Sequence, residues 1–577
     1  MIRTLAKSIR QYKLSSILAA VFVIGEVIME VMVTFLMSKM IDEGFSSENL
    51  DYVLRIGAGM LIMTVLGLTF GLLSARFAAV ASGGLARNLR KDIFYNIQDF
   101  SFQNIDKFSS ASLVTRMTTD ITNVQMAYMM IIRLLVRAPI MMIFSLIMAF
   151  ILSPRLSLVF VIAIPALAVV LIFIIRSAHG YFTKLFKRYD HLNAVVQENL
   201  AGIRTVKAFV RESHEVDKFK VNSERILQLS KSAEKRIILM TPCMFAAVFG
   251  CILFFCTAGS NMIVSETLTT GALMSLITYS VQILSSLMMA SMVLVMVVMA
   301  RSSGERIAEV LTEKSTLHNQ EDPDFDIPDG SIVFDHVSFS YTGDKSKEVL
   351  RDVNLKIRSG ETVGIIGGTG SAKSTLVNLI PRLYDVTEGA LYIGGKDVRT
   401  YDLKTLRDAV SVVLQKNVLF SGTISSNLRW GNKNATQEEI KHAADLAQAS
   451  EFVERFPKKY ETAIDQGGTN VSGGQKQRLC IARALLKKPK ILILDDSTSA
   501  VDTKTDALIR KAFAEEIPDT TKIIIAQRIS SVEHADKILV MDDGVITAVG
   551  THEELLKSSS IYREIYESQQ KGGTEDE

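Results

Sequence analysis

The first 300 residues contain six apolar runs, each long enough to cross a lipid bilayer as a helix. A spanning helix needs about 20 consecutive, mainly apolar residues. The runs exclude a chain that is soluble throughout, in keeping with the 48% of hydrophobic residues in the sequence. The predicted spans are Leu14–Met37, Val53–Ser74, Ala127–Leu152, Leu156–Ile175, Ile238–Ala258 and Ala272–Met299.

The charges of the loops orient these spans. Lys and Arg are frequent in the N-terminal arm and in the long loops after spans two and four, whereas residues 43–51 and 259–270 contain none. Cytoplasmic loops carry the excess of positive charge, so we expect the N-terminus and everything after the sixth span to lie in the cytoplasm. Residues 1–13 have a cationic face and an apolar face, which predicts an amphipathic helix lying in the membrane interface.

Beyond residue 330 the chain alternates short apolar runs with Gly turns and polar helices, a pattern typical of a soluble α/β domain. The formal net charge of +3 gives no reason to expect a nucleic-acid partner. The last residues are rich in Gly and acidic side chains, which predicts disorder. The predicted parts are an interfacial helix (1–13), a six-span domain with long cytoplasmic helical loops (14–300), a linker (301–330), an α/β domain (331–568) and a disordered tail (569–577).

A glycine-rich loop follows the strand pattern Thr362–Ile366 and leads into a helical pattern. Glycines let backbone N–H groups close around phosphate oxygens, and the helix N-terminus adds a favourable dipole. Lys373 is expected to reach the β- and γ-phosphates of ATP, and the Ser374 hydroxyl to bind Mg²⁺. Ala372 stands where the pattern has Gly, and its methyl group can crowd the phosphates or strain the backbone. The predicted ATP-binding residues of this loop are Gly367, Gly368, Thr369, Gly370, Ser371, Ala372, Lys373, Ser374 and Thr375.

A second buried-strand pattern, Ile491–Leu494, ends in an acid, Asp495. A carboxylate at such a strand end can hold Mg²⁺, usually through water. The two motifs together predict an α-helical six-span domain followed by an α/β nucleotide-binding domain of the P-loop type that uses ATP and Mg²⁺.

Between these two motifs lies Ser472-Gly473-Gly474-Gln475, which enters a basic helical segment. It resembles the signature motif of ATP-binding cassette (ABC) exporters, and the resemblance covers essentially the whole chain. The resemblance implies an ABC-type ATPase domain in which the signature contacts the γ-phosphate held by a partner chain. It also implies roles for three single residues: Tyr341 stacks on adenine, Gln415 contacts Mg²⁺ and the attacking water, and Asp502 in Ser499-Ala500-Val501-Asp502 belongs to a loop that crosses the dimer interface.

Two positions depart from the pattern of the ABC family. The residue after Asp495 is normally the glutamate that polarises water, and here it is Asp496, shorter by one methylene. The family's switch histidine is here Gln527, which can donate hydrogen bonds but cannot become cationic. We expect this site to bind ATP and hydrolyse it poorly; the alternative is that both residues are tolerated variants. The signature is intact apart from Val471, where the family usually has leucine. A weak site beside such a signature resembles one half of a heterodimeric bacterial multidrug exporter, whose homologous partner chain supplies the catalytic residues.

Two cytoplasmic segments, Ser109–Arg116 and Glu198–Phe209, are similar to the coupling helices of exporters, which rest on the ATPase domains. In the first span, Glu26 and Glu30 lie on one helical face inside the bilayer. Intramembrane acids are costly and face a cavity or a partner. They could form a polar spot for cationic substrates, or pair with Arg133 or Arg137 of the third span. Methionines near Met288–Met299 could line an apolar pocket or pack against lipid and neighbouring helices.

The sequence therefore predicts a subunit of an ATP-driven exporter of amphipathic or hydrophobic compounds, drugs or lipids, in a bacterial inner (plasma) membrane. Its expected partners are a homologous half-transporter, the lipid bilayer and a small amphipathic substrate. Two alternatives remain: a homodimeric lipid or peptide exporter with a slow site, and a regulatory subunit that binds ATP without transport of its own.

Overall fold

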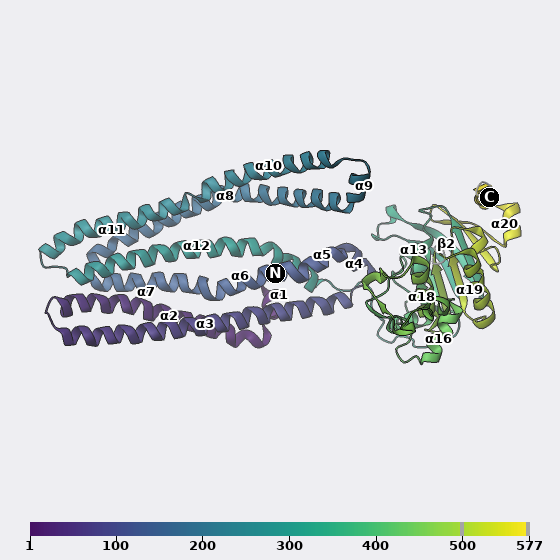
Figure 1. Ribbon diagram of the computed structural model, residues 1–577, viewed down its shortest axis with the longest axis horizontal. Coiled ribbons are helices and arrows are strands. Elements are labelled where there is room, and N and C mark those ends of the chain that lie inside the picture. Colours follow the sequence, from purple (N-terminus) through teal and green to yellow (C-terminus); the bar gives the residue numbers. More distant parts are fainter. Residues whose placement is uncertain (497–500, 573–577) are drawn as a thin grey trace. The chain divides into compact units, whose positions relative to one another are not determined.

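The computed structural model describes residues 1–496 and 501–572 and divides the chain into two compact units. The helical unit contains Met1–Gln98 and Ser109–Glu313, and the sheet unit contains Asp99–Phe108 and the chain from Lys314 onwards. Figure 1 shows long helices in the first unit and strands with shorter helices in the second.

Six helical segments in the described part of the chain are long and apolar enough to span a membrane, and each contains one predicted span. The six-span prediction is therefore confirmed. One continuous helix of 49 residues is about 74 Å long at 1.5 Å per residue, more than twice the roughly 30 Å of a bilayer's hydrocarbon core. The helices of this unit are α1 (Ile2–Lys7), α2 (Lys13–Lys39), α3 (Leu50–Gln98), α5 (Ser110–Thr115), α6 (Ile121–Met130), α7 (Val136–Leu152), α8 (Pro154–Ala201), α9 (Ile203–Ala208), α10 (Glu212–Ile237), α11 (Met240–Val264) and α12 (Thr270–Thr312), with short irregular helical turns η1 (Arg10–Tyr12), η2 (Met40–Phe45), η3 (Arg116–Asp120) and η4 (Ile131–Leu135).

Small residues bring the first two spans together. Ala19 of α2 and Ala78 and Ala81 of α3 are at most 1% exposed. The hydroxyl of Ser74 donates a hydrogen bond to the carbonyl of Ala19 at 3.1 Å. Small side chains let helix backbones approach closely where lipid gives no hydrophobic drive, so the sequence of these two helices fixes their pairing.

Asp42, just after the first span, holds the beginning of α12. Its carboxylate accepts hydrogen bonds from the backbone N–H of Gly271 and from the hydroxyl of Thr269, each at 2.7 Å. A Cβ atom on Gly271 would lie 2.3 Å from the carbonyl oxygen of Ser38. The missing side chain of Gly271 therefore permits the contact, and the carboxylate meets the positive end of the helix dipole.

The sheet unit contains two larger sheets. A six-stranded sheet has the order β12-β11-β3-β10-β9-β6, parallel except for β12, and a four-stranded antiparallel sheet has the order β2-β1-β4-β5. The strands are β1 (Ile332–Phe339), β2 (Leu350–Ile357), β3 (Thr362–Gly367), β4 (Glu388–Ile393), β5 (Lys396–Asp397), β6 (Val410–Val413), β7 (Gly422–Thr423), β8 (Ala463–Ile464), β9 (Ile491–Asp495), β10 (Thr521–Ile525), β11 (Lys537–Asp542) and β12 (Val545–Gly550). β9 and β10 are almost fully buried and contain the continuous apolar runs Ile491–Leu494 and Ile523–Ile525, as parallel strands covered on both faces do.

Helices of the sheet unit lie between these strands, except for α4, which precedes them, and α20 and α21, which follow β12. They are α4 (Phe102–Phe108), α13 (Lys373–Leu379), α14 (Leu403–Ala409), α15 (Ile424–Leu428), α16 (Gln437–Leu446), α17 (Ser450–Val453), α18 (Gly473–Leu485), α19 (Thr503–Glu516), α20 (His552–Ser558) and α21 (Ser560–Gly572). The described part of this unit also contains four short 3-10 turns: η5 (Lys345–Lys347), η6 (Lys459–Glu461), η7 (Gln466–Gly468) and η8 (Ile529–Ser531).

Two predicted boundaries are wrong. The linker was expected over 301–330, but α12 continues to Thr312, because Ile307 and Val310 are fully buried and extend its apolar pattern. The tail was expected from residue 569, but α21 continues to Gly572, and residues 573–577 lie outside the described part of the chain.

Candidate functional site

The predicted nucleotide residues gather at one edge of the six-stranded sheet. β3 ends at the phosphate loop, β9 ends at Asp495, and Gln527 and Gln415 follow β10 and β6. These four strands are parallel neighbours in the order β3-β10-β9-β6. Ligands of such sheets bind outside the carboxyl ends of the strands, so the topology brings together motifs that lie more than 150 residues apart.

The phosphate loop has the geometry that its glycines predict. A Cβ on Gly367 would lie 2.2 Å from the carbonyl oxygen of Met541, whereas at Gly368 and Gly370 it would point into open space. Thr369 lies between these two glycines, and the Ser371 hydroxyl closes the loop with a bond to the Gly368 carbonyl at 2.9 Å. The loop therefore leaves its backbone open on one side, where phosphate oxygens can approach.

Lys373 begins α13, and its ammonium group lies inside the loop. It donates hydrogen bonds to the carbonyl oxygens of Gly367 and Gly368 at 2.9 and 2.7 Å. Burial lowers the pKa of Lys373, while the carboxylates of Asp495 and Asp496 act in the opposite direction. A cation held by carbonyl groups at the mouth of the loop is placed to exchange these contacts for phosphate oxygens.

Ala372 adopts the left-handed conformation that the family's glycine would take without strain. Its φ and ψ are 70° and 19°. A residue with a Cβ pays roughly 1–2 kcal/mol for this region, whereas glycine enters it freely. The departure from the motif is therefore a cost in backbone strain at the residue that precedes Lys373.

Replacing Ala372 by Gly is expected to raise the thermal stability of the sheet unit by about 1 kcal/mol, because the strain outweighs the extra freedom of Gly in the unfolded chain. We also expect tighter ATP binding. Thermal unfolding and equilibrium ATP binding of the purified chain check this, with Ala409→Gly at the end of α14 as a control that should destabilise. An unchanged or lower melting temperature for Ala372→Gly would contradict the strain.

Ser374 and Asp495 form an oxygen pair suited to Mg²⁺. The Ser374 hydroxyl donates to the Asp495 carboxylate at 3.1 Å. Burial raises the pKa of Asp495, the hydrogen bond from Ser374 lowers it, and the neighbouring Asp496 charge raises it. A bound divalent cation would add positive charge beside these two acids, and hydroxyl and carboxylate oxygens are the ligands that Mg²⁺ prefers. The donor set fits the ion.

Asp496 is hydrogen-bonded to both other predicted catalytic residues. Its carboxylate accepts from the Gln527 amide at 2.6 Å and from the Gln415 amide at 3.4 Å. Its backbone is left-handed, with φ of 47°, a conformation that Asp tolerates better than most residues. The structure therefore brings the three predicted residues together around one short carboxylate.

Tyr341 lies beside the phosphate loop, in a cluster of aromatic rings. Its hydroxyl is 3.0 Å from that of Thr375 in α13, and its ring meets those of Phe339 and Tyr384 edge-on, with centroids 4.9 and 5.1 Å apart. Tyr341 is 37% exposed, so part of its ring remains available for stacking.

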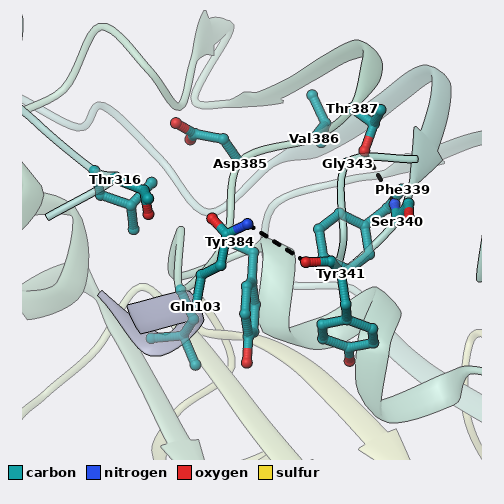
Figure 2. A pocket seen from close by; sticks show the side chains of 12 residues that line it. Gln103, Thr316, Phe339, Ser340, Tyr341, Gly343, Tyr384, Asp385, Val386 and Thr387 are labelled. Atoms are coloured by element: carbon teal, nitrogen blue, oxygen red, sulfur yellow. Dashed lines mark hydrogen bonds between the residues drawn. The ribbon is translucent and has the colours of Figure 1, made fainter. Parts of the chain in front are cut away.

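A cavity of about 220 Å³ adjoins Tyr341, and a helix that the sequence patterns missed lines one side of it. Figure 2 shows Gln103 of α4 reaching the backbone carbonyl of Tyr341, a hydrogen bond of 3.4 Å. The Tyr384 hydroxyl donates to Asp106 of the same helix at 2.7 Å. The predicted first coupling segment, Ser109–Arg116, belongs to the helical unit. The segment that packs within the sheet unit is Asp99–Phe108, too short to show a helical period.

The signature residues form the N-terminus of α18. Ser472 caps the helix: its hydroxyl accepts from the Gln475 N–H at 3.3 Å, and the Gln475 side chain accepts from the Ser472 N–H at 2.9 Å. Gly473 and Gly474 form the first turn and add no side chains over the exposed N–H groups. Such a terminus favours an anion.

Asp502 caps α19 by accepting a hydrogen bond from the Thr505 N–H at 2.9 Å. That bond from the backbone is the main cause that lowers the pKa of Asp502. Ser499 and Ala500 of the same predicted loop lie outside the described residues.

Glu26 and Glu30 both contact a cation in a neighbouring helix. Both carboxylates pair with the guanidinium of Arg137 in α7, the Glu30 contact at 2.5 Å. The pairing that the sequence left open between Arg133 and Arg137 is thus made by Arg137. The other oxygen of Glu26 is buried without a hydrogen-bond partner, and one guanidinium serves two carboxyl groups.

Six spanning helices joined to a P-loop domain with a capped signature helix define a membrane-embedded transport ATPase. Residues 16–287 match the family described as the ABC transporter transmembrane region, and residues 350–499 match the ABC transporter family. The chain belongs to the ABC transporters: it is an exporter half-transporter, with one transmembrane domain and one ABC ATPase domain.

Relatives match the chain over nearly its full length. It is 38% identical over 561 residues to the ABC transporter ATP-binding protein YfiB of Bacillus subtilis, covering 97% of each chain. It is 30% identical over 539 residues to an ATP-dependent lipid A-core flippase of Desulfotalea psychrophila, covering 93% of each. A solved structure of a bacterial Atm1-family ABC exporter with ATP bound has the same fold, with a TM-score of 0.80, 24% identity, and coverage of 97% of this chain and 98% of that one.

Proposed function

We propose that this chain is one half of a heterodimeric exporter that moves amphipathic or hydrophobic compounds, drugs or lipids, out of the cytoplasm or the inner leaflet. Its own site binds ATP with Mg²⁺ held by Ser374, Asp495 and Gln415, and hydrolyses it slowly. Its signature residues, led by Ser472, complete the partner's site, where hydrolysis is fast.

The observation that carries this proposal is the hydrogen-bonded pair of Asp496 and Gln527 beside an intact signature helix. General-base catalysis needs a carboxylate within about 2.6–3.2 Å of the water that it activates. Asp496 is one methylene shorter than the family's glutamate, so its carboxylate reaches less far toward that water. A neutral amide at position 527 also supplies no positive charge for the developing charge on the γ-phosphate.

The loop charges support a cytoplasmic ATPase domain. Binding of ATP between two cassettes would favour their closed dimer, and hydrolysis would release it. A ligand shifts such an equilibrium only by its different affinity for the two states. In this arrangement the slow site keeps ATP between the cassettes while the partner's site cycles.

A lipid substrate has one specific observation in its favour, the 30% identity to a lipid A-core flippase. That relative also keeps the homodimeric lipid exporter as the second candidate function. Both candidates share an amphipathic substrate class and differ in the partner, so the partner decides between them.

The test is purification of the tagged chain from its native membrane, followed by two variants. We expect a second, homologous half-transporter to copurify. In the complex, Ser472→Ala should abolish most ATP turnover, because it removes a contact to the partner's γ-phosphate, whereas Lys373→Ala should leave much of it. A chain that purifies only with itself, and whose turnover disappears with Lys373→Ala, would overturn the heterodimer.

A further inference from the structure

The last helix of the chain packs beside the loop that carries Gln527. In α21, Tyr562 is fully buried, and Ile561, Ile565 and Tyr566 pack against the same apolar core as Ile529. The His552 ring of α20 meets the rings of Tyr562 and Tyr566 edge-on. This packing fixes where the final turn of α21 lies.

Gln569 continues the packed face of α21 by one turn. Its position follows Tyr562, Ile565 and Tyr566 at the three- and four-residue spacing of one helical face. Apolar contacts end there, and an amide takes their place. The Gln569 side chain therefore reaches the loop at residues 527–529 from a helix that is held in place by its apolar contacts.

Both ends of the Gln569 amide are used, and both bind backbone. Its nitrogen donates to the carbonyl oxygen of Gln527 at 2.7 Å. Its oxygen accepts from the N–H of Ile529 at 2.9 Å. An amide that satisfies a carbonyl and an N–H two residues apart acts like a short strand partner and restrains the loop at two points.

The loop that Gln569 restrains carries a side chain that contacts Asp496. The side-chain amide of Gln527 donates to Asp496 at 2.6 Å. Two hydrogen-bonding steps thus connect the end of the chain to the carboxylate beside the Mg²⁺ ligand Asp495. A shift of the backbone at residue 527 would move the side-chain amide of Gln527, because the backbone sets the direction of a side chain.

We propose that Gln569 is a positioning residue of this ATP site: it clamps the backbone of residues 527–529 and so aims the Gln527 amide at Asp496 and at the γ-phosphate. The inference rests on the proposed role of Gln527 in this chain's own site. It assigns a function to the last turn of α21, where the sequence predicts the start of a disordered tail at residue 569.

The test is a double-mutant cycle on the full chain in lipid, with ATP hydrolysis followed in a single turnover with protein in excess. Gln569→Ala and Gln527→Ala should each lower the rate by about three- to tenfold, the range of one net hydrogen bond. The double variant should lose no more than the larger single loss, because both changes break one chain of contacts. The ATP dissociation constant and the melting temperature of Gln569→Ala should stay at the wild-type values.

Gln570→Ala is the matched control, because this neighbour on α21 donates to the Tyr566 hydroxyl at 2.9 Å. Gln569→Glu is the second variant: it keeps the acceptor for Ile529 but loses the donor to Gln527, and should be as slow as Gln569→Ala. Hydrogen exchange of the 527–531 peptide gives a readout without hydrolysis, and should quicken in Gln569→Ala but not in Gln570→Ala.

Wild-type rates in Gln569→Ala, unchanged exchange at 527–531, or losses that multiply in the double variant would each overturn the proposal. A fast wild-type turnover would contradict the slow site of the proposed function while leaving the cycle readable. The role of Gln569 and the slow ATP site can therefore be disproved separately.

Discussion

Replacing Asp496 by Glu and Gln527 by His in one chain is expected to raise its rate of ATP hydrolysis by roughly 10- to 100-fold. A positioned general base contributes about 10²–10⁴-fold, and part of this gain is lost because Glu tolerates the left-handed backbone of position 496 less well than Asp. The longer side chain reaches the water, and the imidazole can carry a positive charge near the γ-phosphate. Steady-state phosphate release by the purified chain in lipid measures the effect.

The single changes separate the two contributions. Each change alone should give a smaller gain in rate. In Asp496→Glu the new carboxylate would still face Gln527, and in Gln527→His the imidazole would still face the short Asp496. Lys373→Ala added to the double change should remove the gained activity, which shows that it belongs to this site. A double variant that hydrolyses ATP no faster than the wild type would mean that these two residues do not limit the reaction.

Replacing Arg137 by Ala is expected to destabilise the helical unit by about 3 kcal/mol, the lower end of the 3–5 kcal/mol for breaking a buried ion pair. The variant leaves Glu26 and Glu30 without a counter-charge inside the spans. The lower end applies because the Glu30 side chain is 41% exposed. Melting temperature and yield of the full chain in detergent and lipid report the loss.

Adding Glu26→Gln and Glu30→Gln to Arg137→Ala should restore most of the lost stability, because no charge is then left unpaired. The same two Gln changes in the wild-type background also test the substrate interpretation. If the carboxylates serve only to hold Arg137, transport and substrate-stimulated ATP turnover should fall for cationic and neutral amphiphiles alike. A loss confined to cationic compounds would mean that the glutamates contact the substrate.

The parts of this structure that the sequence predicts are those set by local chemistry. Bilayer thickness requires the six apolar runs, and phosphate binding requires the glycines before Lys373. The acids at the end of β9 are predictable because parallel strands of one sheet end at a common edge. Gln415 and Gln527 were placed by resemblance alone, and the structure brings both within hydrogen-bonding distance of Asp496.

The parts that escaped prediction depend on contacts between distant segments. Arg133 and Arg137 are four residues apart, so helical periodicity cannot choose between them. Only the fold shows that Arg133 lies in the irregular turn η4 (Ile131–Leu135) and Arg137 in α7. Asp99–Phe108 is too short to show a period, and it packs through Asp106 and Gln103. Gln569 gains its role from two backbone groups about 40 residues earlier.

ATP hydrolysis by the purified chain alone in lipid, measured beside ATP binding on the same sample, distinguishes a weak ATP site from a working one. We expect ATP binding that depends on Lys373, with little turnover until a homologous partner chain is added. Robust turnover by the chain alone, lost on Lys373→Ala, would contradict the weak site and make a working homodimer the function of this exporter.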